Sequence, residues 1–461
     1  MSQPVMSQTS RPRAAVILAA GKGTRMKSSL PKVMHPVGGR PMVDWSIDLA
    51  RRAGCSQIVV VAHPSQGLLI EHIASLPGDI PVAFQDPPMG TGHAVKCAAD
   101  ALSGFQGDLV VLYGDSPLVP ADAIEELFAS LEEGAAVGVL GFATHEPGLY
   151  GRLITSGHGQ LEAIVEAREA TPEQLLVTLC NSGVMAAGAE DMFRLLEKVT
   201  NDNAKGEYYL TDLVGLARAE GRRCQAVRCA EEDMIGCDSK ADLAEAEAIF
   251  QARRRKLALE DGVTLIAPDT VYFSYDTAVE HDVVVEPNVV FGPGVTVKSG
   301  AQIRAFSHLE GATIGPYASV GPFARLRPGA VLDEAAFVGN FVEVKNVHMA
   351  EGAKASHLSY LGDGEIGAGA NIGAGTIFCN YDGFFKYRTS IGEGAFIGSN
   401  SALVAPVTIG EGAIVGSGSV ITKDVEAGAL AVARGRQVER KGWATAFREK
   451  MTARKAAKKK G

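Results

Sequence analysis

Two hydrophobic periods divide the chain. From residue 14 to about residue 230, short continuous apolar runs alternate with amphipathic stretches. Strands are predicted by AAVILAA (14–20), QIVVVA (57–62), DLVVLYGD (108–115) and AAVGVLGFAT (135–144). Helices are predicted by MVDWSIDLARRAG (42–54), AIEELFASLEE (123–133) and DMFRLLEKV (191–199). This alternation is typical of an α/β domain with a Rossmann-like, mostly parallel sheet, whose ligands bind beyond the carboxyl ends of the strands.

From about residue 265, apolar residues recur every six positions. The series runs through Val285, Phe291, Val297, Ile303 and Leu309, then Ile314, Val320, Leu326, Leu332, Val338 and Val344, then Ile366, Ile372 and Phe378, and finally Ile391, Ile397, Leu403, Ile409, Val415 and Ile421. A period of six fits neither a helix nor a flat strand, and it predicts a parallel β-helix of hexapeptide repeats. The repeat breaks at 343–365 and 379–390. Loops that interrupt a rigid scaffold often carry function.

The two periods predict how the chain divides into domains. Residues 1–238 form the α/β domain, and residues 261–440 form the β-helix. The segment SKADLAEAEAIFQARRRKLA predicts a long helix, with Ser239 and Asp242 as a capping box, so 239–260 is interpreted as a helical linker. The remainder, 441–461, is interpreted as a basic, partly disordered tail.

Composition and charge exclude several classes of protein. The 461 residues carry a net charge of −9, which argues against a general nucleic-acid binder. No apolar stretch approaches the roughly 18 residues of a membrane span, and the polar N-terminus lacks the apolar core of a signal peptide. The seven cysteines contain no C-x-x-C pair. We therefore expect a cytoplasmic protein with free thiols and no membrane or nucleic-acid partner.

The first strand leads into a glycine-rich, basic loop, LAAGKGTRMKSSLPK (18–32). Gly21 and Gly23 let the backbone approach a phosphate closely, and Arg25 and Lys32 add two cations, a combination that suits a triphosphate. The loop matches neither the Walker A motif nor the dinucleotide-binding motif. The alternative interpretation is a tight turn with solvated basic residues.

His357 is the candidate catalytic group of the C-terminal half. It lies in SHLSYLGD, three residues before Tyr360 and after two cations, Arg327 and Lys345, which could bind a sugar phosphate. A lone histidine is more often structural or solvated, so that alternative stays open on these residues alone.

Several motifs in order resemble a known family. LAAGKGTRM followed by PK, then QDPPMGTGHA (85–94), LYGDSPL (112–118), YGR (150–152), IVE (164–166) and CNSGV (180–184), resemble the sugar-nucleotide pyrophosphorylases. With the hexapeptide repeats, residues 14 to about 440 resemble the bifunctional bacterial N-acetylglucosamine-1-phosphate uridyltransferases and glucosamine-1-phosphate acetyltransferases. The resemblance implies a left-handed β-helix, a homotrimer, and synthesis of UDP-N-acetylglucosamine for the cell envelope from UTP, acetyl-CoA and glucosamine 1-phosphate by way of N-acetylglucosamine 1-phosphate.

The resemblance also assigns roles in the N-terminal half. Arg25 and Lys32 would be catalytic, while Gln85, Gly90 and Thr91 would read the uracil. The implied contacts to the nucleotide sugar are Leu18, Ala19, Ala20, Gly21, Lys32, Gln85, Gly90, Thr91, Tyr113, Gly114, Asp115, Gly151, Glu166, Asn181 and Asp238.

Two of these carboxylates, Asp115 and Asp238, would bind Mg²⁺, for which oxygen ligands are normal. Asp115 follows a buried strand, where the alternative is a turn or helix-capping residue. Asp238, in MIGCDSK, stands where the family has an asparagine, so it adds a charge and leaves the metal affinity open.

In the C-terminal half the resemblance makes His357 the general base, a role that suits an imidazole near its ordinary pKa of about 6.5. The implied contacts to the sugar phosphate are Arg327, Lys345, Tyr360 and Asn371, and those to acetyl-CoA are Ala374, Asn380, Tyr381, Ser399, Ser417 and Arg434. Ser417 stands where some relatives have alanine.

Two other classes remain as alternatives. One is a single-activity sugar nucleotidyltransferase whose β-helix serves only oligomerisation or regulation. The other is a non-enzymatic scaffold with the same two folds. The pair His357 and Tyr360 and the NYDG loop after residue 379 favour the bifunctional enzyme, because a spacer would not need them.

Overall fold

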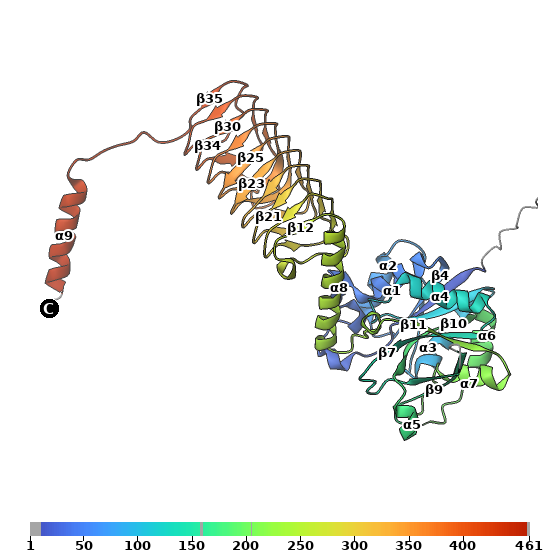
Figure 1. The fold of residues 1–461 in the computed structure, drawn as a ribbon. Coiled ribbons are helices and arrows are strands. Elements are labelled where there is room, and N and C mark those ends of the chain that lie inside the picture. Colours follow the sequence, from blue (N-terminus) through green and yellow to red (C-terminus); the bar gives the residue numbers. More distant parts are fainter. Residues whose placement is uncertain (1–10, 157–159, 204, 459–461) are drawn as a thin grey trace, which may run out of the picture. The chain divides into compact units, whose positions relative to one another are not determined.

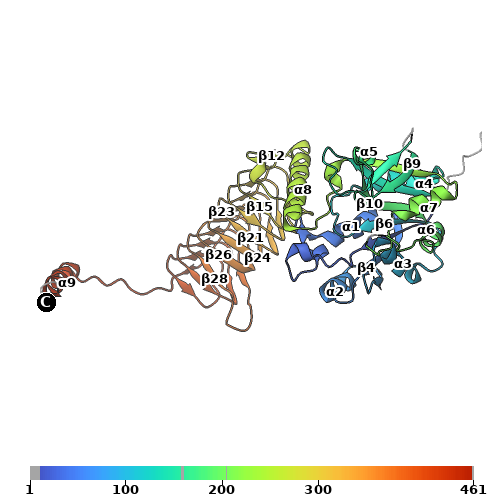
Figure 2. The same ribbon diagram turned by 90° about the horizontal axis from the view of Figure 1, so that it is seen from below.

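The computed structural model describes residues 11–156, 160–203 and 205–458. These residues form two compact units (Figures 1 and 2). The first contains the chain up to Leu257 together with Phe273–Tyr275, and the second contains Ala258–Tyr272 and the chain from Asp276 onward. Within the described part, none of the helices is both long enough and apolar enough to traverse a bilayer. The seven cysteines are all unpaired, as predicted.

A nine-stranded sheet forms the centre of the first unit, in the order β5-β4-β1-β6-β10-β7-β11-β9-β8. Its strands are β1 (Arg13–Leu18), β4 (Cys55–Ala62), β5 (Val82–Phe84), β6 (Asp108–Tyr113), β7 (Val137–Ala143), β8 (Arg152–Thr155), β9 (Gln160–Val165), β10 (Leu179–Gly188) and β11 (Cys224–Cys229), beside a small pair, β2 (Pro36–Val37) and β3 (Arg40–Pro41). The strands β5, β4, β1 and β6 pair in parallel, whereas β10 and β9 run against their neighbours. All four strands predicted in this unit are present.

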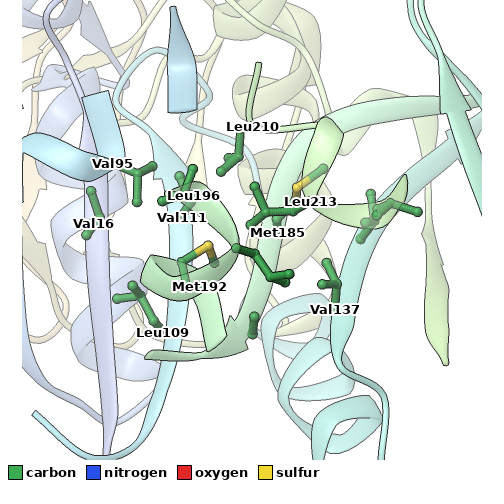
Figure 3. Packing of buried hydrophobic residues seen from close by; sticks show 14 of the residues in the cluster. Val16, Val95, Leu109, Val111, Val137, Met185, Met192, Leu196, Leu210 and Leu213 are labelled. Carbon is green, nitrogen blue, oxygen red and sulfur yellow. The ribbon is translucent and has the colours of Figure 1, made fainter. Parts of the chain in front are cut away.

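Helices pack against both faces of this sheet. Those with residues in the two sheet cores are α1 (Met42–Arg52), α2 (Gly67–Ser75), α3 (Thr91–Cys97), α4 (Ala121–Glu132), α6 (Ala189–Leu196) and α7 (Asp212–Ala219). The chain also forms α5 (Pro172–Leu175), which buries no residue, and α8 (Lys240–Glu260), which packs in a separate cluster with Val37 and Met42. Alternate residues of each strand enter different cores, because side chains alternate across a strand. Val16 and Val111 pack into a core with Met192 of α6 (Figure 3), whereas Ile17 and Val110 pack into the opposite core. The predicted α/β domain with a mostly parallel sheet is therefore confirmed, and its helices cover both faces.

The long helix α8 begins with the predicted capping box. The Ser239 hydroxyl accepts a hydrogen bond from the Asp242 backbone N–H at 3.3 Å, and the Asp242 carboxylate accepts one from the Ser239 N–H at 2.8 Å. The same carboxylate accepts a bond of 3.0 Å from the Asp238 N–H. The cap therefore fixes the backbone of Asp238, a predicted site residue.

Short parallel strands form the stacked coils of the second unit (Figure 1). They are β12 (Thr264–Leu265), β13 (Ala278–Val279), β14 (Val284–Val285), β15 (Val290–Phe291), β16 (Thr296–Val297), β17 (Gln302–Ile303), β18 (His308–Leu309), β19 (Ala312–Ile314), β20 (Ser319–Val320), β21 (Arg325–Arg327), β22 (Ala330–Leu332), β23 (Phe337–Asn340), β24 (Glu343–Met349), β25 (Lys354–His357), β26 (Tyr360–Ile366), β27 (Asn371–Ile372), β28 (Ile377–Cys379), β29 (Thr389–Ile391), β30 (Phe396–Ile397), β31 (Ala402–Val404), β32 (Val407–Ile409), β33 (Ile414–Val415), β34 (Val420–Ile421) and β35 (Leu430–Ala431). Every residue of the predicted six-residue series is at most 4% exposed. The hexapeptide β-helix is therefore confirmed.

The first predicted break is wrong. Residues 343–365 continue the coils as β24, β25 and β26, with Met349, Ala355 and Leu361 buried at the inward positions. A five-residue step before Met349 and the small side chain of Ala355 conceal the period in the sequence. The second break is present: the chain between β28 and β29 forms a loop, closed by a bridge between Tyr381 and Lys386, that projects from the coils (Figure 2).

The C-terminal tail also differs from expectation. Trp443–Lys458 form the helix α9 where partial disorder was expected. Alanine, lysine, arginine and methionine dominate this segment, and all four favour helix.

The inward series can be tested with two isoleucines. Ile397 is 0% exposed, whereas Ile414 on a neighbouring coil is 48% exposed. We expect Ile397→Ala to destabilise the β-helix by about 2–5 kcal/mol, because it leaves a cavity. Calorimetry should then show its unfolding transition lowered by at least about 4 °C. Ile414→Ala should leave the transition nearly unchanged, and equal effects of both variants would contradict the assignment of the core.

Candidate functional sites

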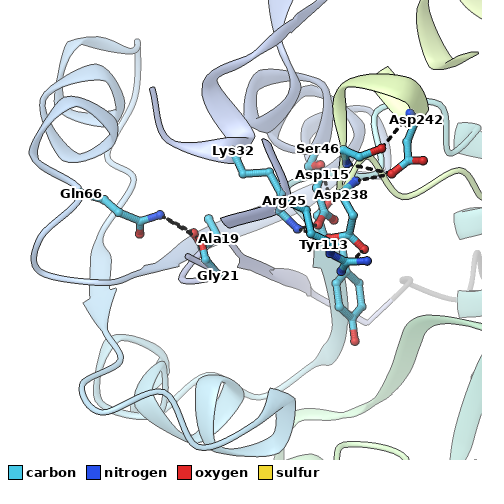
Figure 4. A network of polar contacts seen from close by, with 11 residues as sticks. Ala19, Gly21, Arg25, Lys32, Ser46, Gln66, Tyr113, Asp115, Asp238 and Asp242 are labelled. Atoms are coloured by element: carbon cyan, nitrogen blue, oxygen red, sulfur yellow. Dashed lines mark hydrogen bonds and ion pairs between the residues drawn. The ribbon is translucent and has the colours of Figure 1, made fainter. Parts of the chain in front are cut away.

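The glycine-rich loop after β1 is held from outside by Gln66. The Gln66 amide donates to the carbonyl of Ala19 at 3.1 Å, and its own oxygen accepts a hydrogen bond from the His63 N–H at 2.7 Å (Figure 4). Gly23 has φ +58°, and a Cβ there would lie 2.7 Å from the Cβ of Lys32. The loop conformation therefore requires glycine at this position. The absence of a side chain there lets Lys32 pack closely against the loop.

Two cations and two carboxylates form one cluster beside the loop (Figure 4). Lys32 Nζ contacts the carboxylate of Asp115 and lies 3.0 Å from Asp238 Oδ1. Arg25 Nη2 lies 2.8 Å from Asp238 Oδ2. Burial alone would lower the pKa of Lys32, but the attraction of Asp115 and Asp238 outweighs it and raises that pKa above its ordinary value. Lys32 is therefore a fully charged ammonium at neutral pH.

This cluster lies at a cavity of about 630 Å³. Thirteen predicted contacts line it: Leu18, Ala19, Ala20, Gly21, Arg25, Lys32, Gln85, Gly90, Thr91, Tyr113, Asp115, Glu166 and Asn181. Three other predicted residues touch the lining from behind. Asp238 pairs with Lys32, and the Gly114 N–H donates to the Leu18 carbonyl at 3.0 Å. A Cβ on Gly151 would lie 3.5 Å from a carboxylate oxygen of Glu166.

The cavity carries acidic and amide groups besides the cations. Burial, reinforced by Glu169 and opposed by Lys205, raises the pKa of Glu166. The Asn181 side-chain oxygen accepts a hydrogen bond of 3.0 Å from the Gly183 N–H. Cations suit phosphate groups, whereas carboxylate and amide groups suit sugar hydroxyls. The lining therefore provides for both parts of a nucleotide sugar.

His357 is exposed at the end of β25, in register with Asn340 of β23. Its Nδ1 contacts the side-chain oxygen of Asn340. An amide oxygen only accepts hydrogen bonds, so Nδ1 carries a proton, and in the neutral form of the ring Nε2 keeps the lone pair. The structure therefore presents an imidazole that can accept a proton at Nε2.

The predicted sugar-phosphate cations occupy one register on successive coils. Arg327 of β21 pairs with Lys345 of β24, which pairs with Gly362 of β26. A Cβ on Gly362 would lie 2.6 Å from the Tyr360 hydroxyl, so Tyr360 joins the group. The neighbouring ammonium of Lys386, together with burial, lowers the pKa of Lys345, as expected where cations gather. Asn371 lies apart on β27, in register with Lys354.

Three predicted acetyl-CoA contacts occupy equivalent corners of successive coils. Ala374, Ser399 and Ser417 each follow a glycine. A Cβ on the glycine before Ala374 would lie 2.6 Å from the Ser399 nitrogen, and one on the glycine before Ser399 would lie 2.5 Å from the Ser417 nitrogen. Arg434 Nη1 donates to the Ser417 carbonyl at 2.6 Å. These four residues therefore form one column.

Comparison with known proteins provides independent evidence of the family to which this chain belongs. Residues 15–176 match the MobA-like NTP transferase domain, and residues 388–423 match the bacterial transferase hexapeptide (six repeats). The bifunctional protein GlmU of Hyphomonas neptunium is 69% identical over 453 residues, 98% of each chain. Those of Maricaulis maris and Caulobacter vibrioides are 56% and 55% identical, covering 97% and 98% of this chain and 99% and 98% of the relatives.

The chain belongs to the GlmU family. It is a bifunctional enzyme of UDP-N-acetylglucosamine and cell-wall synthesis: it acetylates glucosamine 1-phosphate and transfers UMP from UTP to N-acetylglucosamine 1-phosphate. The prediction from the sequence is confirmed, and neither the single-activity enzyme nor the non-enzymatic scaffold is retained.

In this GlmU family member, the first cavity has further lining residues beyond the predicted contacts. Lys22, Val33, Pro88, Ala94, Lys205, Glu207, Tyr209 and Thr211 also line it. Tyr208 N–H donates to the Met89 carbonyl, and Gly92 N–H donates to the Tyr208 carbonyl, each at 2.8 Å, so the run KGEYYLTD lies against the predicted base-reading segment. A polar, aromatic run between predicted elements was the only signal available.

Asp363 is the residue missed in the second site. Its two carboxylate oxygens accept hydrogen bonds from the amides of Asn346 at 2.8 Å and Asn380 at 2.7 Å, and Lys345 Nζ lies 4.0 Å away. Burial would raise the pKa of Asp363, but these hydrogen bonds and the nearby cations lower it below its ordinary value. Asp363 therefore joins a predicted sugar-phosphate contact to the predicted acetyl-CoA contact Asn380, whose side chain is buried.

Replacing this carboxylate should destabilise the β-helix. In Asp363→Asn the new amide can satisfy one of the two asparagine donors but faces the other with a donor, which costs about 2 kcal/mol. Because the folded pKa is depressed, the stabilisation is complete above the unfolded pKa of about 3.9 and is lost as pH falls through the folded value. Thermal unfolding of both proteins should differ by a constant amount between pH 7 and pH 5 and converge in more acidic buffer. A difference that grows on acidification would refute this account.

Proposed function

We propose that the cavity of the first unit is the uridyltransferase site. The observation that carries the proposal is the cluster of Arg25, Lys32, Asp115 and Asp238 at the edge of a cavity of nucleotide-sugar size. A phosphate oxygen of N-acetylglucosamine 1-phosphate attacks the α-phosphorus of UTP, the α–β phosphoanhydride bond breaks, and pyrophosphate leaves. Arg25 and Lys32 stabilise the charge that spreads over the phosphoryl oxygens, and the lining orients the two substrates.

Roles within the cavity follow the sequence assignment. The loop Leu18–Gly21 contacts the nucleotide, and Gln85, Gly90 and Thr91 read the base. Gly151, Glu166 and Asn181 hold the sugar and ribose hydroxyls.

The two carboxylates suit a magnesium ion. Mg²⁺ commonly uses one or two carboxylates together with substrate phosphates and water, rather than a cage made of protein alone. Asp115 and Asp238 share Lys32, and among the described residues no group of three or more histidine, cysteine or acidic side chains is arranged to hold a metal ion by itself. Bound there, Mg²⁺ would supply charge neutralisation at the phosphates. Lys32 and Arg25, now engaged by these carboxylates, would then be available to the phosphates.

We propose that the β-helix carries the acetyltransferase site around His357. His357 Nε2 accepts a proton from the 2-amino group of glucosamine 1-phosphate. As it does so, the amine nitrogen forms a bond to the thioester carbonyl carbon of acetyl-CoA and the carbon–sulfur bond breaks. The leaving thiolate takes up the proton held by His357, so that coenzyme A departs as the thiol. Arg327, Lys345, Tyr360 and Asn371 hold the sugar phosphate. The column of Ala374, Ser399, Ser417 and Arg434, with Asn380 and Tyr381, binds acetyl-CoA.

We further propose a cytoplasmic homotrimer with small-molecule substrates and no nucleic-acid or membrane partner. One surface of the β-helix supports self-association. The rings of Phe306, Phe323 and Phe341 stack along successive coils with centroids 4.9 and 5.2 Å apart, and each is about half exposed. Contiguous apolar surface of this kind is typical of an interface.

The two site assignments predict separable losses. Arg25→Ala should reduce uridyl transfer by about 10²–10³-fold, because it removes a cation that stabilises the transition state, and should leave acetyl transfer unchanged. His357→Ala should reduce acetyl transfer by about 10²–10⁴-fold at neutral pH and leave uridyl transfer unchanged. Pyrophosphate release and thiol release, measured separately, check the two outcomes. Loss of both activities in either variant would count against that assignment.

The charge at position 238 should set the metal affinity. Asp238→Asn restores the amide of the family pattern and removes one of the two carboxylates. We expect divalent metal to bind about tenfold more weakly, because affinity follows the charge of the ligands, as measured by calorimetric titration with Mn²⁺ in the presence of UTP. Asp79→Asn, at an exposed aspartate outside the cavity lining, is the matched control and should leave the affinity unchanged. An unchanged affinity in Asp238→Asn would remove Asp238 from the metal site.

A further inference from the structure

Gln85, assigned above to base reading, is buried with both amide hydrogens in use. It follows β5, and its backbone N–H donates to the Ala62 carbonyl at 3.0 Å, which fixes the main chain. Its side-chain Nε2 lies 2.9 Å from the Gly90 carbonyl and 3.2 Å from His93 Nδ1. The side chain lines the cavity although the residue is only 4% exposed.

The two partners determine which end of the amide faces the ligand. The Gly90 carbonyl only accepts, so it requires the NH₂ end of Gln85 on its side. Gly90 packs closely against the main chain of Tyr208, since its φ is +99° and a Cβ there would lie 2.7 Å from the Tyr208 carbonyl oxygen. Among the described residues, no protein donor is bonded to Gln85 Oε1. The free group is therefore an acceptor.

His93 can accept the second amide hydrogen only as a neutral imidazole with a bare Nδ1. With Nδ1 bare, the neutral ring carries its proton on Nε2, which lies 3.8 Å from Cys97 Sγ, one turn later on α3. Burial and the nearby Lys96 lower the pKa of His93, which favours the neutral ring. Tyr208 also faces this ring, at 6.3 Å between centroids. His93 does not line the cavity, so its effect passes through Gln85.

We propose that His93 is a positioning residue that holds Gln85 as a hydrogen-bond acceptor and so selects pyrimidine bases with an N3–H group. Uracil and thymine carry a donor at N3, which pairs with Oε1. Cytosine carries a lone pair at N3, which Oε1 repels. A site built to hydrogen-bond one group rejects an analogue that lacks it, because its buried polar atom is left unpaired. The proposal rests on the assignment of the cavity to UTP.

The test compares two substitutions of the same size class in the full-length enzyme. The variant His93→Asn places an acceptor oxygen on Cγ where histidine has Nδ1, whereas His93→Leu places a methyl group there. We expect His93→Leu to lower the ratio of kcat/KM for UTP over CTP about tenfold, mainly through a higher KM for UTP with kcat little changed. His93→Asn should retain the wild-type ratio. His145→Leu, an exposed histidine outside the cavity lining, should also retain it.

The possible outcomes distinguish failure of the positioning role of His93 from failure of the proposed base site at Gln85. An unchanged ratio in His93→Leu, or an equal loss in His93→Asn, overturns the positioning role. If His93→Leu does not fold, as judged by circular dichroism and acetyl transfer, His93→Ala is measured against the same expectations. Gln85→Leu tests the foundation: an unchanged KM for UTP in that variant overturns the proposed base site itself. A raised KM in Gln85→Leu with an unchanged ratio in both His93→Leu and His93→Ala overturns the positioning role alone.

Discussion

Parallel pairing of neighbouring strands is the constraint on which both sites depend. In the first unit, β4 and β6 flank β1 in parallel, so the residues that follow all three strands reach the same edge of the sheet. Leu18 pairs there with Val61 and Tyr113, and the glycine-rich loop and Asp115 begin from that edge. In the second unit the same pairing places Arg327 and Lys345 at equivalent positions on successive coils. Residues far apart in the sequence therefore converge because their strands pair in parallel.

Each site holds its cations in place with carboxylates. Lys32 pairs with Asp115 and Asp238, Lys345 lies near Asp363, and Arg327 Nη1 donates to Glu343 at 2.9 Å. Such pairs offset the cost of keeping a partly buried charge beside a cavity, and they orient the side chains before a substrate arrives. A phosphate group competes for the same donors, so binding exchanges one set of ionic contacts for another. The net gain is then smaller than a count of phosphate contacts would suggest.

Periodic patterns predicted most of the fold, because burial repeats wherever the backbone repeats. The series through Ile303, Val338 and Leu403 is buried throughout. The prediction failed at Ala355, where a small side chain occupies an inward position that the pattern expects to be large. It also failed at α9, because helix propensity is weak evidence in a polar tail.

The site residues, like the fold, could be predicted only where a local sequence pattern marks them. The glycine-rich loop, Lys32 and Asp115 belong to local motifs, and the structure brings them together. Glu207 and Tyr209 line the same cavity through a segment that only the fold places there. Asp363 and His93 act through hydrogen bonds to other side chains, and nothing local to either residue indicates its partner. Contacts of this kind depend on the packing of separate segments and cannot be read from spacing.

The corner column that contains Asp363 shows how a repeat accommodates chemistry. Gly311, Gly329, Asn346 and Asp363 all have positive φ, between 53° and 84° for the glycines and near 50° for the other two. Glycine is the residue that best tolerates this conformation, and asparagine and aspartate are the next most tolerant. The column changes from glycine to side chains with polar groups at the coils that carry Lys345 and Tyr360, and Asp363 bonds from there to Asn380 on the next coil. Asn346 and Asp363 therefore accept a conformational cost, and they offset it by hydrogen-bonding to each other while they hold the residues of the site. The scaffold thus acquires a polar network without any change in the path of its backbone.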